Sequence, residues 1–145
     1  IYLCFMNGKY PLLATANPSS CVAGKIMRCE RLILNIYRKH LSAFGLTNSQ
    51  LSILMIVAKM GKLKQANLAM MLHLEKSTVS RNIKRLLKSE LLQRIDSKQL
   101  AITDKGKILV EATIPAWENA KTEVNEMLGE EGQAALNIIL SHLKK

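Results

Sequence analysis

The sequence predicts a mainly α-helical protein with one small β-hairpin, and three observations lead to this prediction. Almost half of the 145 residues are hydrophobic but only 4% are aromatic, which suits a helical core of leucine, isoleucine, methionine and alanine. Hydrophobic residues recur every three or four positions over most of the chain. Only residues 91–103 hold two short β-prone runs close together. A chain of this length is expected to form one domain with a real core.

The N-terminal third is predicted to be an arm followed by one long helix. Residues 1–20 form the arm, because residues 7–20 hold two prolines and several turn formers and are expected to be extended or looped. Met6 could be the native start, in which case residues 1–5 would be foreign to the native protein. From residue 21 to 43 hydrophobic side chains return at helical spacing, and the helix is expected to end near Gly45.

The middle third is predicted to contain three helices and the hairpin. Thr47 with Gln50 forms a capping box before a helix of residues 48–59 that is apolar around most of its girth and should be buried. Two shorter helices, 64–72 and 75–89, are separated only by His73 and Leu74. The runs LLQRI and QLAIT then flank Asp96-Ser97-Lys98, which indicates a tight hairpin.

The last third is predicted to be helical. Thr103 should cap a helix from Asp104 to about Leu128, with Pro115 kinking it. Gly129 and two following glutamates indicate the start of a last helix that ends near residue 143. Helix, short turn, helix and hairpin in this order make a winged helix-turn-helix.

The second of the two short helices has two chemically distinct sides. With about 100° per residue, Ile83, Leu86 and Leu87 fall within about 80° of Val79, while the opposite arc holds cations and small hydroxyls. Such a helix fits the major groove of DNA. Its members on the polar arc are Ser77, Thr78, Arg81, Lys84, Arg85 and Lys88. The alternative interpretation is an ordinary solvated basic face.

The charge of the chain favours an acidic partner. The formal net charge is +10, and it is unevenly spread. Residues 1–61 carry seven Lys or Arg against one acid, residues 62–107 eleven against four, and residues 108–145 three against six. The helix with the cationic arc therefore lies in the most basic part, and double-stranded DNA is the expected partner.

We predict different roles for the cations and hydroxyls of this region. Residues near the start of such a helix usually contact bases, so Ser77, Thr78 and Arg81 are the base-reading candidates. Cations further along are expected to contact phosphates and set the register. The full predicted DNA-binding set is Lys64, Gln65, Ser77, Thr78, Ser80, Arg81, Lys84, Arg85, Lys88, Arg94 and Lys98.

From Leu46 to Leu143 the chain resembles the MarR family of bacterial transcriptional regulators. The segments that carry the resemblance are LTNSQLSILMIV, NLAMMLHLEKSTVSRNIKRLLKSELLQR, AITDKGK and IPAWENA. The resemblance implies a cytoplasmic bacterial or archaeal homodimer that binds a pseudo-palindromic site, with its recognition helices about 34 Å apart in successive major grooves. The implied parts are an arm (1–20), a first dimerisation helix (21–45), a winged helix-turn-helix domain (46–107) and C-terminal dimerisation helices (108–145). Packing within one chain would also explain the apolar stripes of the terminal helices.

The sequence departs from the family pattern at four places, one of which is Lys64 in place of the usual hydroxyl N-cap of the helix 64–72. His73 stands where the helix-turn-helix usually has glycine, and is expected to be a turn residue with positive φ. Glu90 replaces the glycine that usually ends the recognition helix, so the helix is expected to run on. The wing is short and has no arginine at its tip, which predicts contact with phosphate rather than minor-groove reading.

The family resemblance also suggests two kinds of signal. A small apolar or phenolic effector would bind among Tyr37, His40, Met55 and Trp117, although ordinary core packing is the alternative. Oxidants would act on Cys21 and Cys29, for which a packing role is the alternative that we favour.

Several functions are not expected. The three cysteines (Cys4 is the third) lack a zinc spacing, and no catalytic cluster or glycine-rich phosphate loop occurs, so we predict no metal, no cofactor and no enzyme. IYLCFM makes a poor signal peptide, and the longest apolar run, residues 51–58, is too short to span a bilayer. The prediction is a dimeric sequence-specific repressor released by a small molecule or an oxidant. The alternatives are a non-specific architectural DNA-binding protein and a winged-helix interaction module without DNA.

Overall fold

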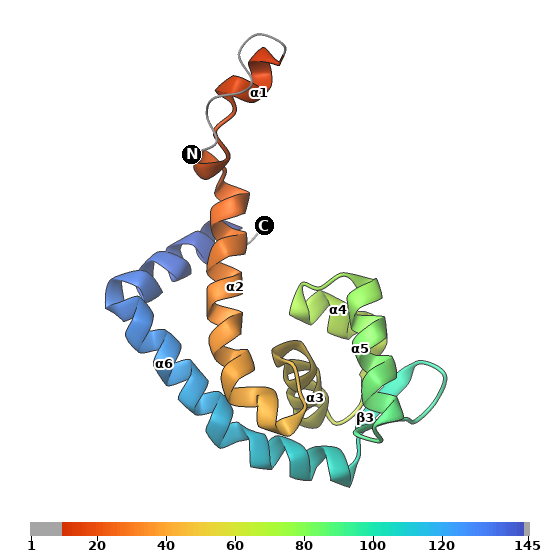
Figure 1. The fold of residues 1–145 in the computed structure, drawn as a ribbon. Coiled ribbons are helices and arrows are strands. Elements are labelled where there is room, and N and C mark those ends of the chain that lie inside the picture. Colours follow the sequence, from red (N-terminus) through yellow and green to blue (C-terminus); the bar gives the residue numbers. More distant parts are fainter. Residues whose placement is uncertain (1–9, 144–145) are drawn as a thin grey trace. The chain divides into compact units, whose positions relative to one another are not determined.

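The computed structural model describes residues 10–143, and these belong to two compact units, residues 1–34 and 35–145. The first unit contains α1 (Pro11–Thr15), a 3₁₀ turn (Pro18–Ser20) and the first part of α2 (Val22–Leu41), as Figure 1 shows. The prediction of an extended arm is therefore wrong for residues 11–15 and 18–20. The reason is that both prolines stand at the first position of a helical turn, where their fixed φ favours the turn. The predicted foreign segment, residues 1–5, lies outside the described residues.

The core of the second unit is built around α3 (Asn48–Met60). The predicted capping box is confirmed: the amide of Gln50 donates to Thr47 Oγ1 over 3.2 Å, and the amide of Thr47 donates to Gln50 Oε1 over 3.0 Å. Four apolar side chains of the helix are fully buried, as its composition predicted. They are Leu51, Ile53, Leu54 and Val57.

The helix-turn-helix consists of α4 (Gln65–Leu72) and α5 (Lys76–Lys88), which pack side by side (Figure 1). His73 ends α4 with φ 50° and ψ 37°, so its prediction as a left-handed turn residue is confirmed. The turn is closed by a hydrogen bond of 3.2 Å from the amide of Leu74 to the carbonyl of Ala69. A histidine therefore adopts here the conformation that glycine adopts most easily.

The end of α5 corrects one prediction. Glu90 does not let the helix run on, because it adopts φ 59° and α5 ends at Lys88. The amide of Glu90 donates to Leu87 O over 3.0 Å, and the amide of Leu91 donates to Leu86 O over 2.9 Å. This is the hydrogen-bond pattern of a Schellman motif. Burial of Leu91, which is 6% exposed, holds the chain in the turn although Glu90 is not a glycine.

The wing is a three-stranded antiparallel sheet in the order β1-β3-β2. The predicted hairpin is confirmed as β2 (Leu92–Arg94) and β3 (Gln99–Ile102). The third strand, β1 (Leu63–Lys64), was missed, because two residues are too short to show a periodicity. Leu63 stands opposite Leu100, and both are buried. The sheet thereby ties the start of α4 to the wing.

The last helix, α6 (Asp104–Leu143), begins where the wing ends. Thr103 caps it as predicted, accepting a hydrogen bond of 3.0 Å from the amide of Gly106. Gly106 must be glycine, since a Cβ there would lie 2.3 Å from the carbonyl oxygen of Leu91. The backbone stays helical through Pro115 and leaves helical angles only at Gly129 (φ 62°, ψ −178°), which divides α6 into two helical stretches at the predicted place.

Within residues 10–143, no single helix has both the length and the apolar composition of a membrane span. The helices Val22–Phe44 and Asn48–Met60 pass that test only when taken together across a bend.

Candidate nucleic-acid interface

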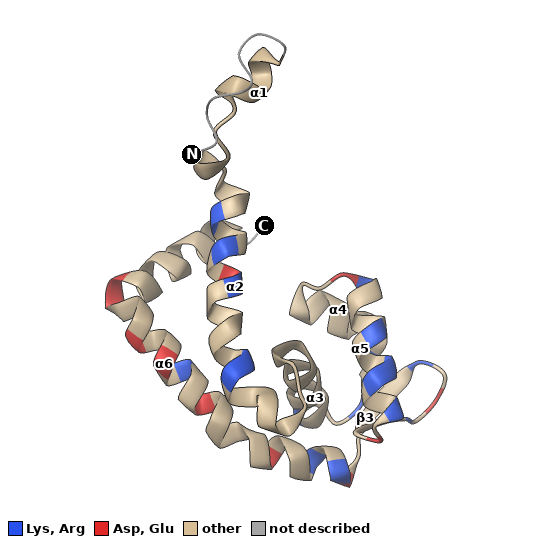
Figure 2. Cartoon of the chain, viewed as in Figure 1, with Lys and Arg blue, Asp and Glu red and all other residues tan. Residues whose placement is uncertain are grey.

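Helix α5 has a buried side and an exposed cationic side, as the sequence predicts. Val79, Ile83 and Leu86 are at most 1% exposed and belong to the core. Figure 2 shows the basic residues following one another along the helix, which has no acid from its first residue to its last. The exposed predicted contacts on it are Ser77, Arg81, Lys84, Arg85 and Lys88. A buried polar residue, Asn82, was not predicted.

Two hydroxyl side chains of α5 are less exposed to solvent than its cations. Thr78 and Ser80 are only half-buried, so their hydroxyls remain near the exposed side. The Nη2 atom of Arg81 donates a hydrogen bond of 3.3 Å to Thr78 Oγ1. This contact restrains the guanidinium beside the first turn of the helix, which is where base contacts are expected.

The cations of α5 make no ion pair within the described residues. The five ion pairs there involve Lys39, His40, Lys105, Lys107 and Lys121. When an unpaired surface cation neutralises a DNA phosphate, the counterions condensed around that phosphate are released. The charge of α5 is therefore available to an external anion.

The wing and the start of α4 bring the other predicted contacts together. Lys64, Arg94 and Lys98 are exposed and line one recess of about 240 Å³ together with Gln65, Ala66 and Ser97. The tip beside this recess is held by Asp96, whose carboxylate accepts hydrogen bonds from the amides of Lys98 (2.7 Å) and Gln99 (2.8 Å). These amide bonds, the one from Lys98 first, lower the pKa of Asp96, so its charge is held at the tip.

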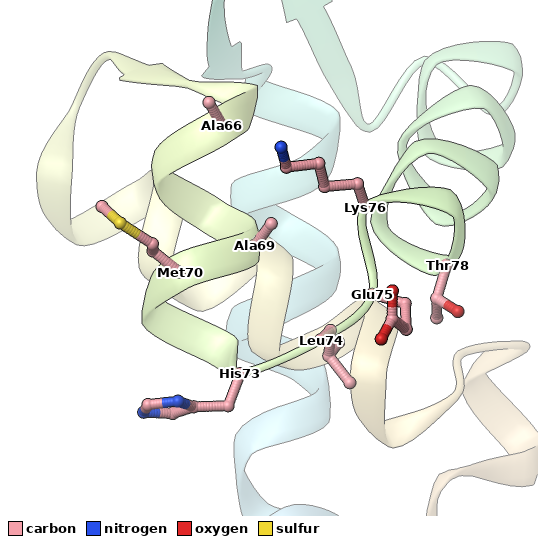
Figure 3. A pocket seen from close by; sticks show the side chains of 8 residues that line it. All are labelled: Ala66, Ala69, Met70, His73, Leu74, Glu75, Lys76 and Thr78. Carbon is pink, nitrogen blue, oxygen red and sulfur yellow. The ribbon is translucent and has the colours of Figure 1, made fainter. Parts of the chain in front are cut away.

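Sequence reasoning missed Lys76, which is exposed at the first position of α5. Figure 3 shows its side chain extending from the start of α5 toward α4, on the side of Ala66 and Ala69. These residues line a hollow of about 680 Å³ between the two helices, together with Met70, His73, Leu74, Glu75 and Thr78. The position of Lys76 in the basic run KSTVSR was the available signal.

The predicted effector residues separate into two places. Met55 and Trp117 line a recess of about 230 Å³ with Ser52, Ile56, Lys59 and Leu72. Tyr37 and His40 do not line it. Burial raises the pKa of Tyr37, with a smaller opposing influence of Lys121.

Ion pairs that were not predicted occur along α6, beside Trp117 and further on. The ammonium of Lys121 lies 4.9 Å from the centre of the Trp117 ring and pairs with Glu118. His40 Nε2 lies 2.7 Å from Glu123 Oε2, and Lys39 Nζ lies 3.6 Å from Glu123 Oε1. The hydrogen bond with His40, foremost among the causes, lowers the pKa of Glu123. His40 thus belongs to a polar cluster with Lys39 and Glu123 between α2 and α6.

The two redox candidates of the first unit, Cys21 and Cys29, are both free and exposed. Packing inside the unit, the interpretation favoured from sequence, therefore does not describe them. Cys4 lies outside the described residues. No group of three or more His, Cys, Asp or Glu within residues 10–143 is arranged to hold a metal ion.

Comparison with known proteins places this geometry in a family. Residues 46–99 match the family model described as the MarR family. The search of curated proteins gave no match.

Solved structures match most of the chain at low identity, which shows the fold. A structure on regulation of DNA binding of Bordetella bronchiseptica BpsR by 6-hydroxynicotinic acid is 20% identical with a TM-score of 0.80, covering 88% of this chain and 96% of that one. Sco5413 from Streptomyces coelicolor, a MarR family transcriptional regulator, is 23% identical with a TM-score of 0.75 and coverages of 89% and 94%. The transcriptional repressor CouR bound to p-coumaroyl-CoA is 19% identical with a TM-score of 0.78 and coverages of 88% and 94%. Residues 46–99 are thus a MarR-family winged helix-turn-helix domain, in a chain with the fold of that family's transcriptional regulators.

Proposed function

We propose that this protein is a homodimeric, sequence-specific DNA-binding repressor of the bacterial or archaeal cytoplasm, released by a small molecule or an oxidant. The observation that carries the proposal is the division of α5 into a side that is at most 1% exposed at Val79, Ile83 and Leu86 and a side of unpaired cations. The buried side holds the helix rigidly, and the exposed side meets the width and charge of a major groove.

The dimer is supported by hydrophobic residues that the described chain leaves exposed. On α2 these are Val22, Ile26, Met27 and Leu32, and near the end of α6 they are Ile138, Ile139, Leu140 and Leu143. Exposed apolar stripes of this size are usual where a partner covers them. A second copy would bury them and hold two copies of α5 in successive major grooves of one duplex.

The recess at Trp117 supports an aromatic effector. Met55, Ile56 and Leu72 supply apolar walls, and Lys59 supplies a cation at the rim. The BpsR structure concerns 6-hydroxynicotinic acid and the CouR structure holds p-coumaroyl-CoA, both of which contain a ring. The exposed thiols Cys21 and Cys29 are the only described cysteines, and they are the sites at which an oxidant would act.

Selection from a random duplex library with the purified protein tests the proposal. A two-fold symmetric motif whose half-sites are about one helical turn apart is expected. Sedimentation of the free protein should give a dimer. Enrichment of no motif together with steep salt dependence would instead indicate a non-specific architectural protein, which the net charge of +10 would also suit. A monomer would contradict the proposal.

A further inference from the structure

Three hollows on the helix-turn-helix share walls and form one furrow. The wing recess and the hollow between α4 and α5 each share lining residues with a third, of about 270 Å³. Ala66 lines all three, while Ala69 and Lys76 line the two nearer the turn. We call the furrow the stretch lined by Lys64, Gln65, Ala66, Ala69, Lys76, Arg94, Ser97 and Lys98.

The furrow is basic, and its cations are unpaired in the described chain. Lys64, Arg94 and Lys98 stand at the wing end and Lys76 near the middle, and none of the ion pairs includes them. The one carboxylate lining the three hollows is Glu75, at the far end near the turn. Asp96 at the wing tip is hydrogen-bonded to backbone amides and lies outside the lining, although Lys64 and Lys62 also lower its pKa.

Two of these lysines lie at the start of a helix and make no hydrogen bond that caps it. Lys64 is the N-cap of α4 and makes no side-chain cap bond, and Lys76 is the first residue of α5, whose N-cap Glu75 makes none either. Helices α3 and α6, in contrast, start with the capping threonines Thr47 and Thr103. A cation at the start of a helix opposes the helix dipole and destabilises the helix. The placement of Lys64 and Lys76 therefore points to an anion outside the chain.

We propose that the furrow seats the phosphates of one DNA strand, with Ala66 as its floor, so that the wing and the start of α4 clamp the backbone without reading bases. The inference rests on the proposed function and deepens it. It assigns a contact to Lys76 and a space-keeping role to Ala66. The exposed side of α5 keeps the reading of bases, and the short wing sets register.

Variants of the furrow test this division. We compare K76Q, K64Q and A66M with the controls K107Q, an exposed lysine outside the furrow, and A58M, an exposed alanine on α3 that lines none of the three hollows. Fluorescence anisotropy measures binding to the selected duplex and to an unrelated duplex of equal length over a salt series. Thermal unfolding of each variant checks that it is folded.

K76Q and K64Q should each reduce the magnitude of the slope of log K against log salt by about two units on both duplexes, one for each protomer, leaving their affinity ratio unchanged. Their Tm should stay the same or rise, because an unfavourable charge leaves the helix start. A66M should weaken binding to both duplexes by about tenfold or more, since a side chain on the floor keeps the backbone from several phosphates at once. K107Q and A58M should bind as wild type.

Neutral methylphosphonate linkages, placed one at a time in the selected duplex, locate the contact directly. At one of these positions the neutral linkage should weaken binding by the wild-type protein but leave binding by K76Q unchanged. Unchanged binding by folded K76Q and A66M, or a changed affinity ratio between the two duplexes, would overturn the furrow while leaving the recognition role of α5 intact. Failure of wild type to bind any duplex would overturn the proposed function itself.

Discussion

Helices α5 and α6 both carry many charges, and they use them in opposite ways. On α5 every charged residue is basic, and none forms an ion pair in the described chain. On α6 three of the seven acids, Asp104, Glu118 and Glu123, each pair with a lysine. Figure 2 shows the same contrast, with the basic run on α5 and most acids on α6. Helix α5 therefore offers open charge of one sign to an external anion, whereas α6 satisfies part of its charge within the chain.

The apolar sides of the two helices differ as well. The buried side of α5 is closed off by the core of its own chain, whereas α6 leaves Ile108, Met127 and four residues near its end exposed. Exposed ion pairs contribute only about 0–1 kcal/mol each, so the pairs on α6 do little for stability. With seven acids against three lysines, α6 keeps a net negative charge, and this suits contact with a second protein chain more than contact with DNA.

The largest effect on the difference between α5 and α6 is expected when a buried side chain that holds α5 against the core is removed. Ile83→Ala should lower the free energy of unfolding by about 2–5 kcal/mol, because a fully buried side chain is replaced by a cavity. Urea denaturation measures it. Lys84→Ala, the adjacent exposed residue, serves as the control and should leave stability within about 0.5 kcal/mol while weakening DNA binding. Equal destabilisation by both changes would mean that the two sides of α5 are not distinct.

Loss of a base-reading side chain should come next in size. Arg81→Ala is expected to cost about 1–3 kcal/mol of binding to the selected duplex and to relax its sequence preference, because a restrained guanidinium can make a bidentate contact with guanine. Binding to the selected duplex and to single-base variants measures both effects. An equal loss on all duplexes would assign Arg81 to the phosphates instead.

A smaller, sequence-independent effect is expected at the other end of α5. Lys88→Ala should reduce the magnitude of the salt slope by about two units on every duplex, since each protomer of the dimer loses one phosphate contact. Anisotropy titrations on the selected and the unrelated duplex measure it. A change in base preference would contradict the phosphate assignment.

The smallest effect should come from α6. The hydrogen bond with His40 lowers the pKa of Glu123, so this carboxylate stabilises the fold above the ordinary glutamate range and stops doing so as pH falls through the lowered pKa. In Glu123→Gln the protein should therefore lose less stability as pH falls than the wild type does. Its DNA affinity should be unchanged. Thermal unfolding from neutral to acidic pH measures this, with Glu126→Gln, an exposed residue of α6 outside the ion pairs, as control. If Tm fell with pH in Glu123→Gln as it does in the wild type, the contact between Glu123 and His40 would have no role in stability.

Local patterns in the sequence predicted most of the helices and the side of α5 that faces out. The predictions failed where a distant segment decides the outcome. Glu90 ends α5 because Leu91 is buried and Thr103, thirteen residues away, donates its hydroxyl to the Glu90 carbonyl over 2.7 Å. Strand β1 exists because β3 offers it a partner. His40 faces Glu123, which is 83 residues away.

By itself, the sequence determined the capping of α3, the left-handed turn at His73 and the two sides of α5, because each depends on residues within about one or two helical turns of one another. Only the tertiary structure decided that Lys64, Lys76, Arg94 and Lys98 line one furrow, and that Tyr37 and His40 do not line the recess at Trp117. Those positions follow from how the strands pair and the helices pack, and hydrophobic periodicity says which side of an element is buried but not which other element covers it.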